Sequence, residues 1–301
     1  PATTESGFAI ALATLTASGA QGAEQAREDA GLLLSRLGAV PYHAGLIEAL
    51  GVAAAGAAVD LPYRLAVVQR LSAIVESPRN DDESLAIRKI ETPDGPLFEF
   101  SGQVAFDTEA LPATIEALER VYTSLSVTPA LKTRIFNLLA QTWEKVASWQ
   151  TVWGPQSSER LALALARMAA RPETPAPACL GVARSMSRQI NRLSVVRALG
   201  ILCAWPLQDE TFDRIATETG AAMLDFWDQP ETAPEERIVA LETAARIVSR
   251  PGLAARGQAA RRLAQRTASL LFEALASGAA CRPFLEWMAA AEGLPRKLRS
   301  D

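Results

Sequence analysis

The sequence predicts an all-α fold of stacked antiparallel helix pairs with one small non-helical insertion. Alanine and leucine dominate a chain that is 49% hydrophobic and only 6% aromatic. Both residues favour helices because a helix costs their side chains little entropy. Apolar residues also recur at helical spacing along most of the chain. With 21% charged residues among 301, the composition is globular, and the length suits two domains or one extended array.

The first 78 residues are predicted to form helical hairpins. We expect helices at residues 3–18 and 22–37, and two more that open at Pro41 and Pro62. A proline fits the first turn of a helix because the N–H it lacks would have no partner there. Gly51, Gly56 and the alanines between them form a face of small residues, which predicts close contact between helices.

Residues 79–108 interrupt the helical pattern. Two short apolar runs, residues 87–90 and 97–100, flank the turn signal Pro93-Asp94-Gly95-Pro96. A small β-hairpin and an ordered loop both fit this pattern. The predicted regions are N-terminal helical hairpins (1–78), the insertion (79–108) and a C-terminal helical-repeat region (109–301), unless all three form one continuous domain.

Helical periodicity resumes after the insertion and continues almost to the end of the chain. Several of these segments begin with an oxygen-bearing cap and an early acidic residue, such as Asp209 followed by Glu210, which is typical of helix starts. The predicted helices are residues 112–126, 129–149, 157–171, 178–189, 192–204, 209–227, 234–250, 256–276 and 282–291.

Several of the predicted helices share one pattern: an arginine, an aliphatic residue, a run of Ala, Val and Leu, and then a proline. The pairs are Arg64 and Pro78, Arg192 and Pro206, Arg237 and Pro251, and the shorter Arg160 and Pro172. Helix starts recur about every 36–45 residues, the period of HEAT-type helix pairs. In this respect about two-thirds of the chain resembles HEAT/armadillo-like α-helical repeat proteins. The resemblance implies a curved stack of helix pairs and no particular activity, and an irregular helical bundle is the alternative.

The charge distribution and the absence of catalytic motifs disfavour two classes of function, general nucleic-acid binding and catalysis. The net charge of −4 disfavours general nucleic-acid binding. The charge is uneven, with −7 in residues 1–150 and +3 in residues 151–301. Almost all positive charge is arginine, which we attribute to a GC-rich, bacterial type of genome. The sequence contains neither a glycine-rich phosphate loop nor the Gly-x-Ser-x-Gly motif, so we predict no catalytic residue.

We also predict no cofactor and no metal. A multi-histidine metal site is excluded because His43 is the only histidine, and we interpret it as a surface or capping residue. Residues 80–84 (NDDES) lack the spaced second carboxylate of a magnesium-binding helix, so we interpret them as a solvated connector. The three cysteines are far apart and have no metal-knuckle spacing. Sparse cysteines favour the cytoplasm over the periplasm.

Three groups of residues are candidate partner-binding surfaces. Arg184, Arg188 and Arg192 fall four residues apart and would form one basic ridge on a helix. Arg262 and Arg266 belong to a second basic surface. Trp143, Trp149 and Trp153 form an aromatic region, since tryptophan is enriched in interface hot spots. The alternatives are that the arginines form solvated faces and that the tryptophans seal the joint between helix pairs.

These features favour a non-catalytic protein-binding or scaffold protein, or a subunit of a larger assembly, with another protein as its partner. One alternative is an α-helical enzyme acting on a nucleic-acid or phosphate-bearing substrate, as HEAT-like DNA glycosylases do. The other is a peripheral subunit that binds a membrane surface through the basic tail at residues 296–299. No transmembrane segment is expected, because the longest apolar run, residues 49–59, is about half the length required.

Overall fold

The computed structural model describes residues 2–39, 43–76, 86–92, 95–101, 110–148, 153–189, 193–203, 209–250, 253 and 257–276. These residues form twelve helices and one antiparallel pair of strands, which confirms the all-α prediction with a single non-helical insertion. The elements are α1 (Ala2–Ser18), α2 (Ala23–Ala39), α3 (Ala44–Ala55), α4 (Leu61–Glu76), β1 (Ala86–Thr92), β2 (Gly95–Ser101), α5 (Ala110–Thr123), α6 (Pro129–Ala147), α7 (Pro155–Ala169), α8 (Ala176–Ser187), α9 (Leu193–Cys203), α10 (Glu210–Asp228), α11 (Pro234–Val248) and α12 (Gln258–Ala276).

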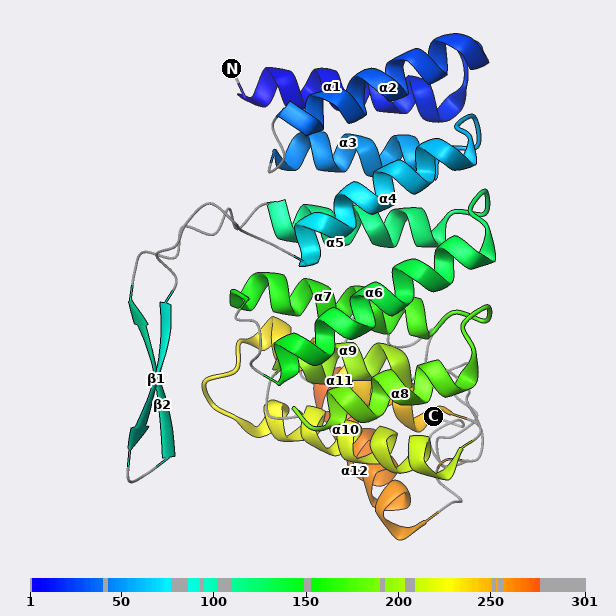
Figure 1. The fold of residues 1–301 in the computed structure, drawn as a ribbon. Coiled ribbons are helices and arrows are strands. Elements are labelled where there is room, and N and C mark those ends of the chain that lie inside the picture. The colour runs from blue at the N-terminus through cyan, green and yellow to red at the C-terminus, as the bar shows by residue number, and fades with distance from the viewer. Residues whose placement is uncertain are drawn as a thin grey trace. The chain divides into compact units, whose positions relative to one another are not determined.

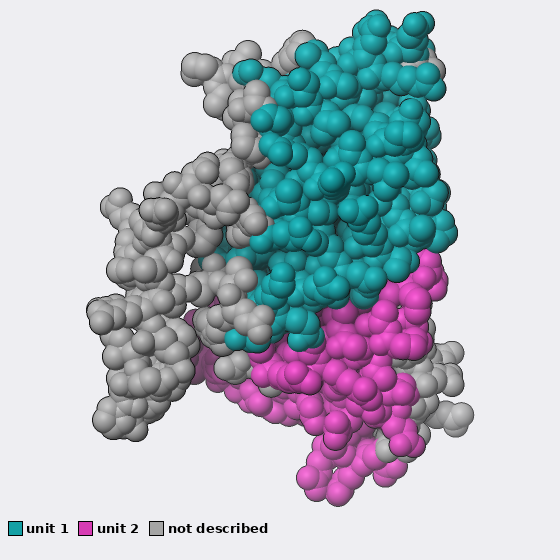
Figure 2. All heavy atoms as spheres, in the orientation of Figure 1, with its two compact units in different colours: residues 1–161 teal, residues 162–301 magenta. Residues whose placement is uncertain are grey.

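The chain divides into two compact units, residues 1–161 and 162–301 (Figure 2). In unit 1, each of α1, α3 and α5 is followed by an antiparallel partner, α2, α4 and α6. The first helices of the pairs form one layer, in which α3 lies against both α1 and α5, and α4 lies against α6 in the other layer (Figure 1). Helix α3 is therefore covered on several sides, and Leu46, Ile47 and Leu50 are at most 2% exposed.

Two glycines, one within α3 and one at its C-terminal end, allow the helices of this layer to pack closely. A Cβ atom added at Gly51 would lie 2.7 Å from the Cβ of Ala117 on α5. One added at Gly56 would lie 2.3 Å from the Cα of Ala17 on α1. Both separations are shorter than carbon atoms can tolerate, so any larger residue would push the helices apart. The predicted small-residue face for close helix contact is thus confirmed.

Hydrogen bonds from Arg64 tie the α3–α4 loop to the α5–α6 loop at one edge of unit 1 (Figure 1). The buried guanidinium donates to three backbone carbonyls: Ala54 O (3.0 Å), Gly56 O (2.6 Å) and Ser126 O (2.7 Å). The hydroxyl of Ser124 adds a bond of 2.6 Å to Ala55 O. Two of these bonds, Arg64 to Ser126 and Ser124 to Ala55, join residues more than 60 positions apart in the sequence. The bonds to Ala54 and Ala55 satisfy carbonyls that the end of α3 leaves without helical partners.

In unit 2, α10 lies against α8, α9, α11 and α12. Two close contacts between helices of this unit are again at glycines, where an added Cβ would meet a side chain: Gly200 of α9 faces Thr243 of α11, and Gly220 of α10 faces Leu263 of α12. A buried ion pair joins the end of α11 to α10, since Arg250 Nη2 is 2.8 Å from Asp213 Oδ1.

The arginine pattern found in the sequence has a counterpart in two of the helices. Arg64 is the fourth residue of α4, and Arg237 is the fourth residue of α11. Each donates to the loop before its own helix, Arg64 to Gly56 O (2.6 Å) and Arg237 to Gln229 O (2.8 Å) and Pro230 O (3.1 Å). Arg160 instead pairs with Glu116 at 3.1 Å. Arg192 lies outside the described residues.

The insertion contains a β-hairpin rather than an ordered loop. Strands β1 and β2 pair in an antiparallel register that places Ile87 opposite Phe100 and Ile90 opposite Leu97, as the two apolar runs predict. The acidic connector (80–84), the predicted helix at 282–291 and the basic tail (296–299) lie outside the described residues. Within the described ranges, no helix combines the length and the apolar character needed to cross a bilayer.

Candidate functional site

A groove in unit 1 runs between α4 and α6, with a volume of about 690 Å³. We call it the α4–α6 groove. Its walls come from the exposed faces of the two helices, which lie in the same layer of the unit (Figure 1). The lining residues are Gln69, Ser72, Ala73 and Glu76 of α4, and Ala130, Thr133, Arg134, Asn137, Leu138 and Gln141 of α6.

Three carboxamides give this groove its chemical character. The side chains of Gln69, Asn137 and Gln141 are exposed, and none of them hydrogen-bonds to another group of the chain within the described residues. A carboxamide carries both a donor and an acceptor, as a peptide group does. These three carboxamides can therefore pair with N–H and C=O groups of another polypeptide, whatever the side chains of that polypeptide are.

The hydroxyl groups of the groove are already occupied as donors. Ser72 donates to Val68 O at 2.7 Å and Thr133 donates to Pro129 O at 3.0 Å, both within their own helices. Their lone pairs remain available to accept. Glu76 and Arg134 are exposed and form no ion pair in the described part of the chain, so the groove carries one charge of each sign and no net charge.

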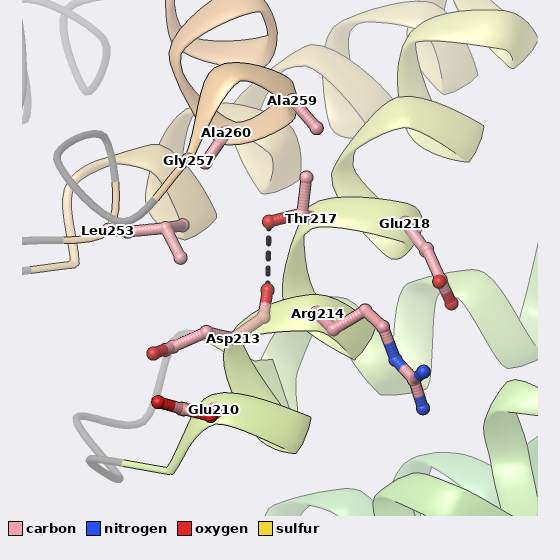
Figure 3. Close-up of a pocket in the computed structure, with 9 residues that line it drawn as sticks. All are labelled: Glu210, Asp213, Arg214, Thr217, Glu218, Leu253, Gly257, Ala259 and Ala260. Carbon is pink, nitrogen blue, oxygen red and sulfur yellow. Dashed lines mark hydrogen bonds between the residues drawn. The ribbon is translucent and has the colours of Figure 1, made fainter.

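A second pocket lies in unit 2 between α10 and the start of α12, with a volume of about 730 Å³ (Figure 3). Figure 3 shows the carboxylates of Glu210 and Asp213 on one side of the pocket, and the side chains of Arg214 and Glu218 directed away from them. Asp213 Oδ1 is 2.8 Å from Arg250 Nη2 in a buried ion pair, so this carboxylate stabilises the fold. The remaining lining residues are Thr217, Leu253, Gly257, Ala259 and Ala260.

The predicted arginine surfaces are only partly available to a partner. Arg184 and Arg188 are both exposed and lie near the C-terminal end of α8, whereas Arg192 lies outside the described residues. Arg262 is exposed on α12. Arg266 forms ion pairs with Asp225 (3.4 Å) and with Asp228 of α10, so its charge is already compensated.

The tryptophans do not form an exposed patch among the described residues. Trp143 is 1% exposed and Trp153 is 6% exposed, and Trp149 is not among the described residues. Both rings lie in the core of unit 1, because an indole buries more apolar surface than most side chains. Their placement fits the sealing role that the sequence also allowed, and neither ring is accessible to a partner.

His43 acts as a helix cap. It is the N-cap residue of α3, and its Nδ1 accepts a hydrogen bond from the Leu46 N–H at 3.3 Å. The structural role expected from the sequence is therefore confirmed.

Cys179 and Cys203 are buried thiols. Burial raises the pKa of Cys179 to about 11 and the pKa of Cys203 to about 12, and the nearby Arg250 opposes this shift in both. Neither thiol is a ready nucleophile at neutral pH. Within the described residues, no group of three or more His, Cys, Asp and Glu side chains is placed to share a metal ion.

Comparisons with known proteins concern the fold alone. No protein-family model matches the sequence, and no curated protein matches it. A crystal structure of an engineered protein from the Northeast Structural Genomics Consortium aligns with a TM-score of 0.52 at 15% sequence identity. The two share a fold. The alignment covers 97% of this chain and 64% of the engineered one, so this chain spans about two-thirds of that protein's length.

Proposed function

We propose that this protein is a non-catalytic binding or scaffold protein that holds an extended segment of a partner protein in the α4–α6 groove. The observation that carries the proposal is that Gln69, Asn137 and Gln141 line this groove with three exposed carboxamides that have no partner in the described chain. An extended segment has unpaired N–H and C=O groups, which such a row complements.

The architecture supports the same proposal. Stacked helix pairs present long surfaces without requiring catalytic groups, and the recurring arginines at helix starts favour a HEAT/armadillo-like array over an irregular bundle. Such an array suits a subunit of a larger assembly. Exposed Arg184, Arg188 and Arg262 offer a further contact to an acidic partner.

The charge of the groove favours protein over nucleic acid as the partner. Nucleic-acid binding depends on several cationic side chains that neutralise phosphates. The α4–α6 groove contains Arg134 and Glu76, which cancel. Membrane binding through the basic tail stays a prediction from the sequence.

A phage-displayed library of random 12-residue peptides tests the proposal. We expect the wild-type protein to enrich peptides, and the synthesised winners to bind the Asn137→Ala/Gln141→Ala variant about tenfold or more weakly, since each lost hydrogen bond contributes roughly 0.5–1.5 kcal/mol. The matched control is Gln258→Ala/Gln265→Ala, which removes two exposed carboxamides of α12. Equal affinity for both double variants, or no enrichment over an unrelated protein, would refute the proposal.

A further inference from the structure

The two charged residues that line the α4–α6 groove have opposite signs and come from opposite walls. Arg134 belongs to the first half of α6, and Glu76 is the last residue of α4. Both side chains are exposed, and neither forms an ion pair in the described part of the chain. Their positions along the groove therefore decide which charges of a partner can approach each of them.

The two helices run in the same direction, which fixes these positions. Arg64 is the fourth residue of α4, and its Nη1 is 2.7 Å from the carbonyl oxygen of Ser126, three residues before α6 begins. Both helices therefore begin at the same end of the groove. Glu76 comes 12 residues after Arg64, whereas Arg134 comes eight residues after Ser126. At 1.5 Å per residue of helix, Glu76 lies about 6 Å further along the groove than Arg134.

The backbone dipoles of the two helices have the same polarity as these side chains. The groove residue Ala130 lies in the first turn of α6, and the N-terminal end of a helix carries partial positive charge. Glu76 lies in the last turn of α4, and the C-terminal end of a helix carries partial negative charge. The groove is therefore polarised along its length: the part near Arg134 attracts an anionic group, and the part near Glu76 attracts a cationic group.

We propose that the partner's extended segment carries an acidic and a basic residue two positions apart, with the acidic side chain at Arg134 and the basic side chain at Glu76. The inference rests on the proposed function. An extended chain covers about 3.3 Å per residue, so a separation of about 6 Å corresponds to two residues. Side chains two positions apart also point to the same side of an extended chain, so both can face the groove.

The two charges supply the selectivity that the carboxamides lack. The carboxamides pair with main-chain groups, which every polypeptide has. Complementary charges contribute to specificity, because a like charge brought against either residue is repelled. A segment with two basic residues at this spacing would place one of them against Arg134, and a segment with two acidic residues would place one against Glu76. The groove therefore favours segments in which the two signs alternate.

Charge reversal at each position tests the pairing, whichever way the segment runs along the groove. The library of random 12-residue peptides is selected on the full chain of the wild type, of Arg134→Glu and of Glu76→Arg. We expect the wild type to enrich peptides with one acidic and one basic residue two positions apart. Arg134→Glu should enrich two basic residues at the same spacing, and Glu76→Arg two acidic residues. Peptides selected on the wild type should bind each variant about fivefold or more weakly, because an attraction becomes a repulsion.

The matched controls reverse two charges of α12 in unit 2. Arg261 and Glu273 are exposed and form no ion pair among the described residues, so Arg261→Glu and Glu273→Arg should enrich the same pattern as the wild type. All four variants change exposed side chains, and a melting temperature equal to that of the wild type checks that each of them folds.

The outcomes separate this inference from the proposed function. Enrichment that depends on Asn137 and Gln141, with one charge pattern on the wild type and on both groove variants, would keep the groove as the binding site and overturn the charge pairing. No enrichment on any of the proteins would refute the proposed function and this inference together. Self-association of the wild type that either groove reversal abolishes would identify a second copy as the occupant, and would also overturn the inference.

Discussion

Replacement of Arg64 by alanine tests how unit 1 holds its loops together. The guanidinium is buried, with 7% of the residue exposed, and it donates to the carbonyls of Ala54, Gly56 and Ser126. Burial lowers the pKa of Arg64 and the nearby Asp60 opposes that shift, so holding the cation there has a cost. The free energy that the three hydrogen bonds contribute must therefore exceed the cost of desolvating the cation.

The expected loss of stability follows from these contacts. A hydrogen bond to a charged group contributes about 1.5–3 kcal/mol, so three bonds set an upper limit of about 9 kcal/mol. Removing the cation also removes its desolvation cost, and water can reach carbonyls at the edge of the unit. We therefore expect Arg64→Ala to lower the free energy of unfolding by about 3–4 kcal/mol. Arg64→Lys keeps the charge but loses the planar fork of donors, and should cost about 2–3 kcal/mol.

Urea denaturation followed by circular dichroism and tryptophan fluorescence measures this loss. Two units can unfold separately, and each contains three of the six tryptophans. The transition that the Arg64 variants shift is therefore the one assigned to unit 1. The control is Arg134→Ala, an exposed arginine without an ion pair in the described chain, which should change stability by less than about 0.5 kcal/mol. If Arg64→Ala stays within about 1 kcal/mol of the wild type, the three bonds do not hold the loops together.

Three further predictions concern packing, pH and partner binding. Gly56→Ala should destabilise the protein by about 1–3 kcal/mol, because its Cβ would lie 2.3 Å from Ala17 Cα. The control Gly181→Ala, whose Cβ would have nothing within 4 Å, should be neutral or stabilising. Equal melting temperatures for the two variants would contradict the close contact at Gly56. Burial raises the pKa of Cys179 to about 11, of Cys203 to about 12 and of Tyr63 still further, so the unfolded chain releases these protons first as the pH rises above about 8.5. These groups leave the urea midpoint unchanged between about pH 7 and 8.5 and should lower it from there to about pH 11, less steeply in Cys203→Ala. A midpoint that stays the same up to about pH 11 would show that the thiols are not buried. Replacing Arg184, Arg188 and Arg192 with alanine should weaken capture of an acidic partner while leaving the melting temperature nearly unchanged, and undiminished binding would make them a solvated face.

Most of the fold can be predicted from the sequence because its determinants are local. Helical periodicity and start signals place the helices to within a few residues, and the turn signal at residues 93–96 predicts a hairpin or an ordered loop, of which the structure has the hairpin. Some ends differ for a local reason. The helix predicted to end at residue 126 ends at Thr123, because Ser124 and Ser126 use their polar groups to brace the loop.

The candidate site depends on contacts between distant residues, which a single sequence does not show. The α4–α6 groove brings Gln69 beside Asn137 and Gln141, about 70 residues apart in the chain. The only sequence signal was a polar residue at every fourth position of one helix face, which any solvated helix shares. The same limit applies to Trp143, since the choice between a core and a surface tryptophan depends on which helices lie against it.

The buried pair of Arg250 and Asp213 has a consequence for local motion in unit 2. Arg250 also donates to Cys203 O at 2.8 Å and lies over the ring of Phe212 at 4.7 Å, so one side chain joins the ends of α9 and α11 to α10. Fraying at the end of α11 or at the start of α10 breaks the ion pair, and fraying at the end of α9 removes a carbonyl acceptor of the same guanidinium. Backbone amides at the three ends should therefore exchange with deuterium at a common opening free energy, as one cooperative unit.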